Sequence, residues 1–452
     1  MSPRVAALLT VAAGVLSTAV PCASQRRTLL DSARVADLLG RLRGADSIVC
    51  QLAGNALINP WNLGNLGNPG DEQLATPTPR PMPRPMPMPF PPVAMSRPAV
   101  RIRLGGLAGW GRYDGSALGA FRAVLRDPSR CVRNVAARVL GRAQASGAYE
   151  AFAALLRDQS VGLRETGALG LAELEDERGA RPLADALKDR EPAVRAAAAV
   201  GLGRLEDATT VGALTGALDD ASPLVRRNAV WALGAIETRQ VREPLARALK
   251  DTDADVRATA AWALGHLEDS AAVAALGDAL KDRDAGVRRA AAYALGQLES
   301  DRSVALLTAA LKDADPDVRQ TAAWALSQTE SVTAVDGLGA SLKDEDVEVR
   351  ETAAWALGQV ESAAAVSALA GALHDREVSV RVAAAWALGQ IESTRGVEPL
   401  KEAMRDEVQE VRRAAVWALS QIDDPRAEDA VRNAAEGDRI RRPRAPRVRV
   451  RP

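Results

Sequence analysis

The sequence predicts an all-α fold, a right-handed solenoid of about ten helical hairpins of 31 residues each. Three observations predict it: an arginine recurs every 31 residues, an aspartate stands six residues before each arginine, and the apolar residues follow helical spacing. Each unit of a solenoid buries its apolar face against its neighbours, so a chain with only 3% aromatic residues can still form a core. The arginines are Arg133, Arg164, Arg195, Arg226, Arg257, Arg288, Arg319, Arg350, Arg381 and Arg412.

One repeat, Ser270 to Glu299, shows the two helices of a unit. The first helix carries apolar residues at i, i+3 and i+7, and the second carries the longer stripe of a helix buried along one side. The stripe of the second helix consists of Val287, Ala290, Ala291, Ala294, Leu295 and Leu298. In other repeats a polar residue followed by proline marks the start of the second helix, as in Asp315-Pro316, Ser222-Pro223 and Glu191-Pro192. We expect the array to cover residues 115–437, with one more first helix from Pro425 to Glu436 closing it.

The repeat resembles the bacterial HEAT-repeat proteins of the phycobilisome-lyase-like type, whose units carry an LKDxDxxVRxxAAxALGxI pattern. Leu249-Lys250-Asp251, Val256-Arg257 and Ala263-Leu264-Gly265 match it, and the resemblance covers about 310 of the 452 residues. It implies a superhelix of hairpins. It is less specific for function, because the family ranges from passive scaffolds to bilin-attaching enzymes and an iron-dependent hydroxylase.

Two charged columns run through the repeats. The aspartates six residues before the arginines favour a structural ladder in which Asp and Arg pair between successive units, rather than catalytic carboxylates. They are Asp127, Asp158, Asp189, Asp220, Asp251, Asp282, Asp313, Asp344, Asp375 and Asp406. A glutamate column stands just ahead of the following first helix, where negative charge suits the helix dipole. It consists of Glu206, Glu237, Glu268, Glu299, Glu330, Glu361 and Glu392.

One aromatic residue per repeat stands five residues after the arginine, on the flank of the second helix rather than in the centre of its buried stripe. We call this the aromatic column: Trp231, Trp262, Tyr293, Trp324, Trp355, Trp386 and Trp417. Four residues further, on the same side, lies the amide column: His266, Gln297, Gln328, Gln359, Gln390 and Gln421. The family resemblance implies that both columns face the concave side of the superhelix.

The two columns together suit an extended peptide, since indole faces clasp side-chain stems while glutamine amides bond to main-chain groups. The alternative is that each ring packs on a neighbouring second helix and fills space left by alanine and glycine. Repeats one to three carry Arg138, Leu169 and Val200 at the aromatic positions, so we expect the groove in repeats four to ten.

The N-terminal residues 1–24 read as a signal peptide, because Arg4 precedes an apolar run from Val5 to Leu16 that is too short to span a bilayer. A lipoprotein reading through Cys22 is the weaker alternative. Export would place Cys50 and Cys131 in an oxidising compartment, and the sequence leaves open whether they form a disulfide. The predicted location is therefore periplasmic or secreted.

Two segments separate this signal from the array. Residues 25–58 read as a short helical segment, with Leu30, Leu38, Leu39 and Leu42 at helical spacing. Residues 59–114 form a Gly/Asn-rich and then Pro-rich linker, with proline at nearly every second position from Pro77 to Pro92.

Enzymatic signatures are scarce. The chain holds two histidines, His266 and His374, and neither is followed by glutamate as the resembling hydroxylase requires. We find no phosphate-binding loop, no nucleophile elbow and no zinc-type cysteine pairs. We therefore expect no catalytic residues, no cofactor and no metal, while a bilin-lyase-like activity rests on the resemblance alone.

The C-terminal tail, residues 438–452, is rich in arginine and proline and is expected to be disordered. It offers contact to an anionic surface or a nucleic acid, although the zero net charge of the whole chain argues against a nucleic-acid clamp. The preferred function is a non-catalytic scaffold in the cell envelope that binds protein or an extended peptide of unknown identity.

Overall fold

The computed structural model describes residues 32–43, 115–329 and 331–441. The predicted signal peptide, the linker and most of the tail lie outside these residues, as does most of the segment 25–58. In the described part the chain is helical throughout and contains no strand. The predicted all-α solenoid of helical hairpins is confirmed. By their contacts, the described residues divide after Ala248 into two units.

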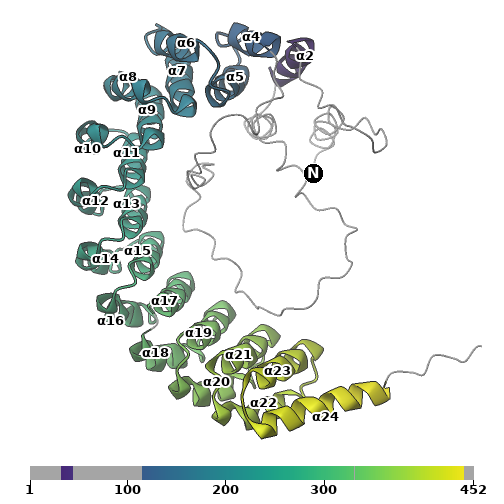
Figure 1. The fold of residues 1–452 in the computed structure, drawn as a ribbon. Coiled ribbons are helices and arrows are strands. Elements are labelled where there is room, and N and C mark those ends of the chain that lie inside the picture. The colour runs from purple at the N-terminus through teal and green to yellow at the C-terminus, as the bar shows by residue number, and fades with distance from the viewer. Residues whose placement is uncertain (1–31, 44–114, 330, 442–452) are drawn as a thin grey trace, which may run out of the picture. The chain divides into compact units, whose positions relative to one another are not determined.

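The first unit stacks helical hairpins in two layers (Figure 1). Its first helices are α4 (Gly115–Ala123), α6 (Ala148–Leu155), α8 (Ala180–Ala186), α10 (Val211–Ala217) and α12 (Arg242–Ala248). Its second helices, which pack side by side, are α5 (Arg130–Arg142), α7 (Val161–Leu174), α9 (Pro192–Leu205) and α11 (Pro223–Ala235).

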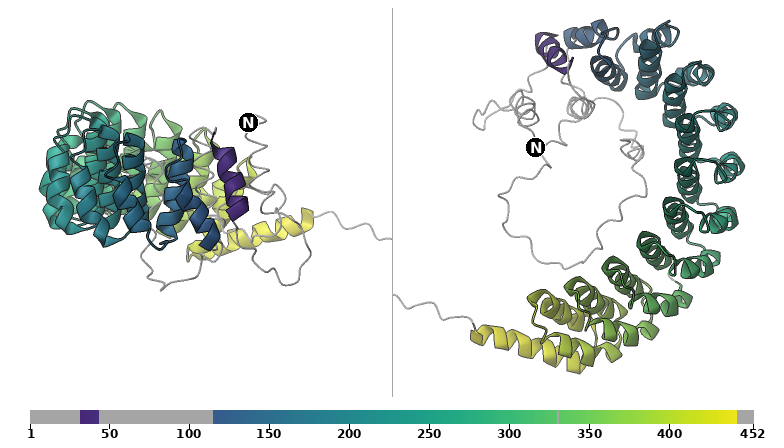
Figure 2. Two further views of the ribbon diagram at one scale, coloured as in Figure 1. Left: turned by 90° about the horizontal axis from the view of Figure 1, so that it is seen from above. Right: turned by 180° about the vertical axis from the view of Figure 1, so that it is seen from behind.

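The second unit repeats this arrangement, and Figure 2 shows the same two layers from behind. Its first helices are α14 (Val273–Ala279), α16 (Asp301–Ala310), α18 (Val335–Ser341), α20 (Val366–Ala372) and α22 (Val397–Ala403). Its second helices are α13 (Ala254–His266), α15 (Ala285–Gln297), α17 (Pro316–Gln328), α19 (Val347–Gln359), α21 (Val378–Ile391) and α23 (Gln409–Gln421). The expected closing helix is present as α24 (Pro425–Arg441), packed against α22 and α23.

Local chemistry sets where the second helices begin and end. Helices α9, α11 and α17 begin at the expected prolines, and the side chain of Asp315 caps α17 by accepting a hydrogen bond from the N–H of Val318. The glutamate column follows the second helices, and its described members have φ between 43° and 52°, the left-handed conformation that terminates a helix. Each of these glutamates also precedes the following first helix, and its favourable interaction with the dipole of that helix stays a prediction.

The core is built from small and branched side chains. In α15, Val287, Ala290, Ala291, Ala294 and Leu295 are all fully buried, as the helical stripe predicts. Alanine at the contacts lets neighbouring second helices approach closely, and each buried leucine contributes about 1.5–3 kcal/mol.

Helix α2 (Ser32–Leu42) closes the first end of the array by packing against α4 and α5. Val35, Leu39 and Leu42 are buried there. Arg43 follows directly, and its Nε lies 3.1 Å from Oδ2 of Asp127. Arg43, just after α2, thus gives Asp127 the arginine partner that a preceding repeat would otherwise provide.

Candidate functional site

Seven Arg/Asp pairs of the ladder join successive hairpins within the two units. In seven pairs the arginine Nε lies 2.6–2.8 Å from Oδ2 of the aspartate 25 residues further on. A terminal guanidinium nitrogen reaches the other carboxylate oxygen at 2.7–3.3 Å. The pairs are Arg164–Asp189, Arg195–Asp220, Arg257–Asp282, Arg288–Asp313, Arg319–Asp344, Arg350–Asp375 and Arg381–Asp406.

The same groups also close the turn inside each hairpin. Arg288 donates to the carbonyl of Asp282 at 2.9 Å, and the Asp282 carboxylate accepts the N–H of Asp284. Burial by itself would raise the pKa of Asp282, but the Arg257 guanidinium and this N–H hold the pKa below its usual range. The ladder is therefore structural, as the sequence predicted, and its carboxylates stay ionised.

The first repeat departs from the pattern. Arg133 donates from Nε to Thr166 Oγ1 at 3.2 Å instead of to Asp158. Asp158 pairs with Arg126 at 2.8 Å.

The aromatic column stands on the second helices. Trp231 belongs to the first unit, and the other six residues belong to the second. All are half-buried except Trp386, which is only 5% exposed. In each unit the row of second helices forms the inner layer (Figure 1).

The aromatic rings also pack against residues of neighbouring repeats. The rings of Tyr293 and Trp324 are stacked, with centroids 5.1 Å apart and planes 7° from parallel. Glycines of the preceding repeat make room for several others: a Cβ added at Gly358 would lie 2.9 Å from the Trp386 ring. The rings therefore fill space between repeats and, except at Trp386, leave part of their surface uncovered.

The amide column lies beside these rings. The His266 ring lies against that of Trp262 in a tilted arrangement, with centroids 4.1 Å apart and planes at 40°, as residues four apart on one helix face allow. Gln328 donates to Ser327 at 2.9 Å, and Gln421 donates to Ser420 at 3.1 Å. The remaining amides make no side-chain hydrogen bond with any described residue, and they are half-buried: Gln297, Gln359 and Gln390.

In three repeats of the first unit the amide positions hold charged residues that sequence reasoning missed. Counting back in steps of 31 residues from Gln297 reaches Arg204, Glu173 and Arg142, so register arithmetic alone could have found them. Glu173 lies between the two arginines, 2.8 Å from each of them. Arg138, at an aromatic position, lies 3.7 Å from the same carboxylate.

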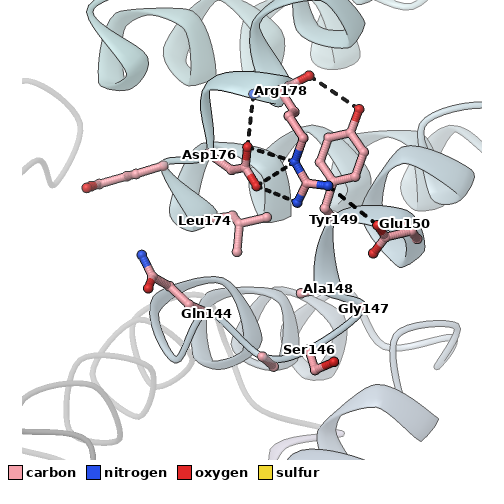
Figure 3. Close-up of a pocket in the computed structure, with 11 residues that line it drawn as sticks. Gln144, Ser146, Gly147, Ala148, Tyr149, Glu150, Leu174, Asp176 and Arg178 are labelled. Carbon is pink, nitrogen blue, oxygen red and sulfur yellow. Dashed lines mark hydrogen bonds and ion pairs between the residues drawn. The ribbon is translucent and has the colours of Figure 1, made fainter. Parts of the chain in front are cut away.

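The described residues also contain a hollow of about 320 Å³ where α5 leads into α6 (Figure 3). Four of its lining side chains are engaged with one another: Arg178 pairs with Asp176 at 2.6 Å, lies 4.2 Å over the Tyr149 ring and approaches Glu150 at 3.6 Å. This hollow is a junction between two repeats.

In the ranges that the structure describes, no helix is long and apolar enough to cross a membrane. Nor do three His, Cys, Asp or Glu side chains gather there in a way that could hold a metal ion. Cys131 is disulfide-bonded, and its partner lies outside the described residues.

Solved structures show related folds at low identity. Importin beta is 15% identical with a TM-score of 0.61, and the match covers 97% of this chain and 62% of that one. The phycocyanin lyase complex of Nostoc is 24% identical with a TM-score of 0.32, covering 54% of this chain and 94% of that one. Human deoxyhypusine hydroxylase is 26% identical with a TM-score of 0.27, covering 56% and 99%. The first of these shows the solenoid fold alone, and the other two are too distant in shape to carry an argument.

A family model described as HEAT repeats matches residues 180–257, 241–327, 304–381 and 370–447, which together exceed half of the chain. No curated protein matches the sequence. HEAT-repeat solenoids are scaffolds typical of protein binding. The matched repeats, the 31-residue ladder and the stacked hairpins agree, and this chain belongs to the HEAT-repeat family.

Proposed function

We propose that the chain is a non-catalytic scaffold that binds an extended segment of a protein along the aromatic and amide columns of its second helices. One observation carries the proposal. Gln297 and Gln359 are half-buried amides that make no hydrogen bond with any described residue, and they stand one turn from the partly uncovered rings of Tyr293 and Trp355.

The chemistry of this surface matches a peptide main chain. A glutamine amide both donates and accepts, so it can bond to the C=O and N–H groups that an extended peptide presents. A partly exposed indole beside it covers apolar side-chain stems. From Tyr293 to Gln421 the repeat places a ring and a glutamine one turn apart in each second helix, which suits a ligand without a compact fold of its own.

Site-specific photo-cross-linking tests the surface in the native cell. A photoreactive amino acid replaces Gln359 on the inner layer, and a matched variant carries it at Ser367, an exposed residue of α20 in the outer layer. We expect a discrete cross-linked protein from position 359 only. Equal cross-linking from both positions, or none from position 359, contradicts the proposal.

Two further variants separate binding from folding. Trp324→Ala with Trp355→Ala should abolish the cross-link while circular dichroism shows unchanged helical content. Because truncating a half-buried ring also removes packing, Gln359→Ala with Gln390→Ala provides the milder change, and it should weaken capture without lowering thermal stability. If the partner is still cross-linked after both pairs of changes, it binds elsewhere on the chain.

The proposed location is the cell envelope. The disulfide at Cys131 supports it, because such bonds persist in oxidising compartments. Protease added to intact spheroplasts should degrade the chain, whereas a cytosolic marker survives. Protection equal to that of the marker would place the scaffold in the cytosol and leave the binding surface to be tested there.

A further inference from the structure

A charged cluster of the first unit lies beside Trp231, the one member of the aromatic column in that unit. Arg138 and Arg142 come from α5, Glu173 from α7 and Arg204 from α9, so three neighbouring second helices contribute to it. A Cβ added at Gly203, next to Arg204, would lie only 2.5 Å from the ring of Trp231, so this ring packs against α9 beside Arg204. Within this unit the cluster is therefore continuous with the aromatic column.

The glutamate at its centre is held deep between two helices. Gly141 allows this, because a Cβ added there would lie 2.7 Å from the Cβ of Glu173. The Glu173 side chain is only 1% exposed. Burial by itself would raise the pKa of this carboxyl, but the three arginines hold the pKa below its usual range.

The arginines are not matched by an equal number of carboxylates. Arg142 and Arg204 share the same Glu173 oxygen at 2.8 Å, while Arg138 reaches the other oxygen only at 3.7 Å, beyond hydrogen-bond distance. The Nε of Arg138 and Oε1 of Glu173 have no hydrogen-bond partner in the described part of the chain. One carboxylate thus faces three guanidinium groups.

The three arginine side chains remain partly open to solvent, at 29% exposure for Arg138, 35% for Arg142 and 21% for Arg204. Burial lowers the pKa of Arg138, and so do the two neighbouring arginines, against the opposite influence of Glu173. The cluster therefore carries an excess of positive charge that a second anion would relieve. Planar guanidinium groups favour carboxylate through paired hydrogen bonds.

We propose that Arg138, Arg142 and Arg204 bind a carboxylate of the bound peptide segment that lies beside Trp231, so that this scaffold selects acidic segments. The carboxylate comes from an aspartate or glutamate side chain or from a free C-terminus. The proposal rests on the proposed function, and it adds a charge requirement located in the first unit.

The test uses the full chain and an array of matched synthetic peptides. Within each pair the peptides differ only by glutamate against glutamine at one position, and all carry amidated C-termini. A second set repeats the glutamine peptides with free C-termini. We expect retention of glutamate peptides over their partners, and weaker retention as salt screens the charges. Enhanced retention of the free C-termini instead would identify the terminal carboxylate as the ligand.

Variants assign the preference to the cluster. Arg138→Gln should reduce binding of the carboxylate peptides about tenfold, since a hydrogen bond to a charged group contributes at about that level. Arg181→Gln, on an exposed residue of α8 in the same unit, should leave binding unchanged. Glu173→Gln should strengthen binding, because it removes the carboxylate that competes for the same arginines. A purely structural cluster predicts no gain.

The outcomes separate this inference from the proposed function. Equal retention of glutamate and glutamine peptides by the wild-type chain overturns the inference, and so does an Arg138→Gln variant with intact preference. Neither result affects cross-linking at position 359, which tests binding along the aromatic and amide columns of the second unit. A labelled single-stranded oligonucleotide that outcompetes every peptide would assign the cluster to phosphate and also overturn it.

Discussion

Arg319 in α17 binds Asp344 of the next hairpin through two hydrogen bonds, Nε to Oδ2 at 2.8 Å and a terminal nitrogen to Oδ1 at 2.7 Å. The same guanidinium donates to the carbonyl of Asp313, and the same carboxylate accepts the N–H of Asp346. One ion pair therefore fixes two turns and the distance between two repeats. Its partners are only 9% and 11% exposed, so solvent screens the pair weakly.

Arg319→Gln should destabilise the second unit by about 3 kcal/mol, because it leaves a buried carboxylate without its partner. Hydrogen exchange should show lost protection in α17 and α19 first, since repeat arrays unfold locally. Arg302→Gln, on an exposed residue of α16, provides the control and should change little. Adding Asp344→Asn to Arg319→Gln should cost less than the two single changes summed. Strict additivity would mean that the pair contributes no coupling.

Acid should unfold the array through its ladder. For the aspartates of the ladder, burial favours a raised pKa, but the arginine and backbone hydrogen bonds lower the pKa overall. Because the pKa of these aspartates is lower in the folded chain, the unfolded chain binds more protons at acidic pH. The stability that the ladder contributes is therefore fully present above the unfolded pKa of about 4. It is lost as the pH falls through the pKa values of the folded chain. We expect thermal midpoints that stay flat from neutral pH to about 5 and fall below about 4. Arg319→Gln should reduce the steepness of that fall.

Much of the fold follows from spacing alone. The period of 31 residues placed Arg288 and Asp313 in register, and helical periodicity identified Val287 and Leu295 as core. These features depend on local geometry that every repeat shares, so the same residue pattern recurs in each repeat of the sequence. Periodicity did not reveal helix α2 as the end cap, because its contact between Arg43 and Asp127 joins residues far apart in the chain.

The candidate site was harder to predict. Spacing put Trp262 and His266 on one helix face, and their rings indeed lie against each other, with planes at 40°. It could not predict that Trp386 is almost fully covered, because cover depends on which side chains the neighbouring repeat presents. Periodicity did not reveal the cluster around Glu173. It identifies residues that recur in every repeat, whereas this cluster consists of exceptions to the repeat.

Glu299→Gly should raise the free energy of unfolding by about 0.5–1 kcal/mol. Glu299 has φ of 43°, a left-handed conformation that costs energy in any residue with a Cβ. Glu299→Ala keeps the Cβ and removes the charge, so it should stay within about 0.5 kcal/mol of the wild type. Urea titration of the three proteins makes the comparison. If alanine stabilises as much as glycine, charge rather than backbone strain is responsible.

Gly389→Ala should destabilise the second unit by about 1–3 kcal/mol. The added Cβ would lie 2.8 Å from the Cα of Ala418 and 2.9 Å from the ring of Trp417, so the two helices must separate. Gly371→Ala in α20 is the matched control, because a Cβ there meets nothing within 4 Å. That change should stabilise the helix by about 0.5–1 kcal/mol. Opposite signs in thermal unfolding would confirm close helix approach, and matching signs would contradict it.

Ser303→Ala should stabilise the chain by about 1 kcal/mol, because a buried hydroxyl without a partner forfeits its hydrogen bonds to water. Ser303 is fully buried in α16, and its Oγ has no hydrogen-bond partner among the described residues. The equivalent position one repeat later holds Ala334, which is also fully buried. The reciprocal change Ala334→Ser should therefore destabilise by a similar amount, as measured by urea unfolding. Loss of stability in Ser303→Ala would show that the hydroxyl finds a hydrogen-bond partner in solution. The argument that this buried hydroxyl destabilises the chain would then be wrong.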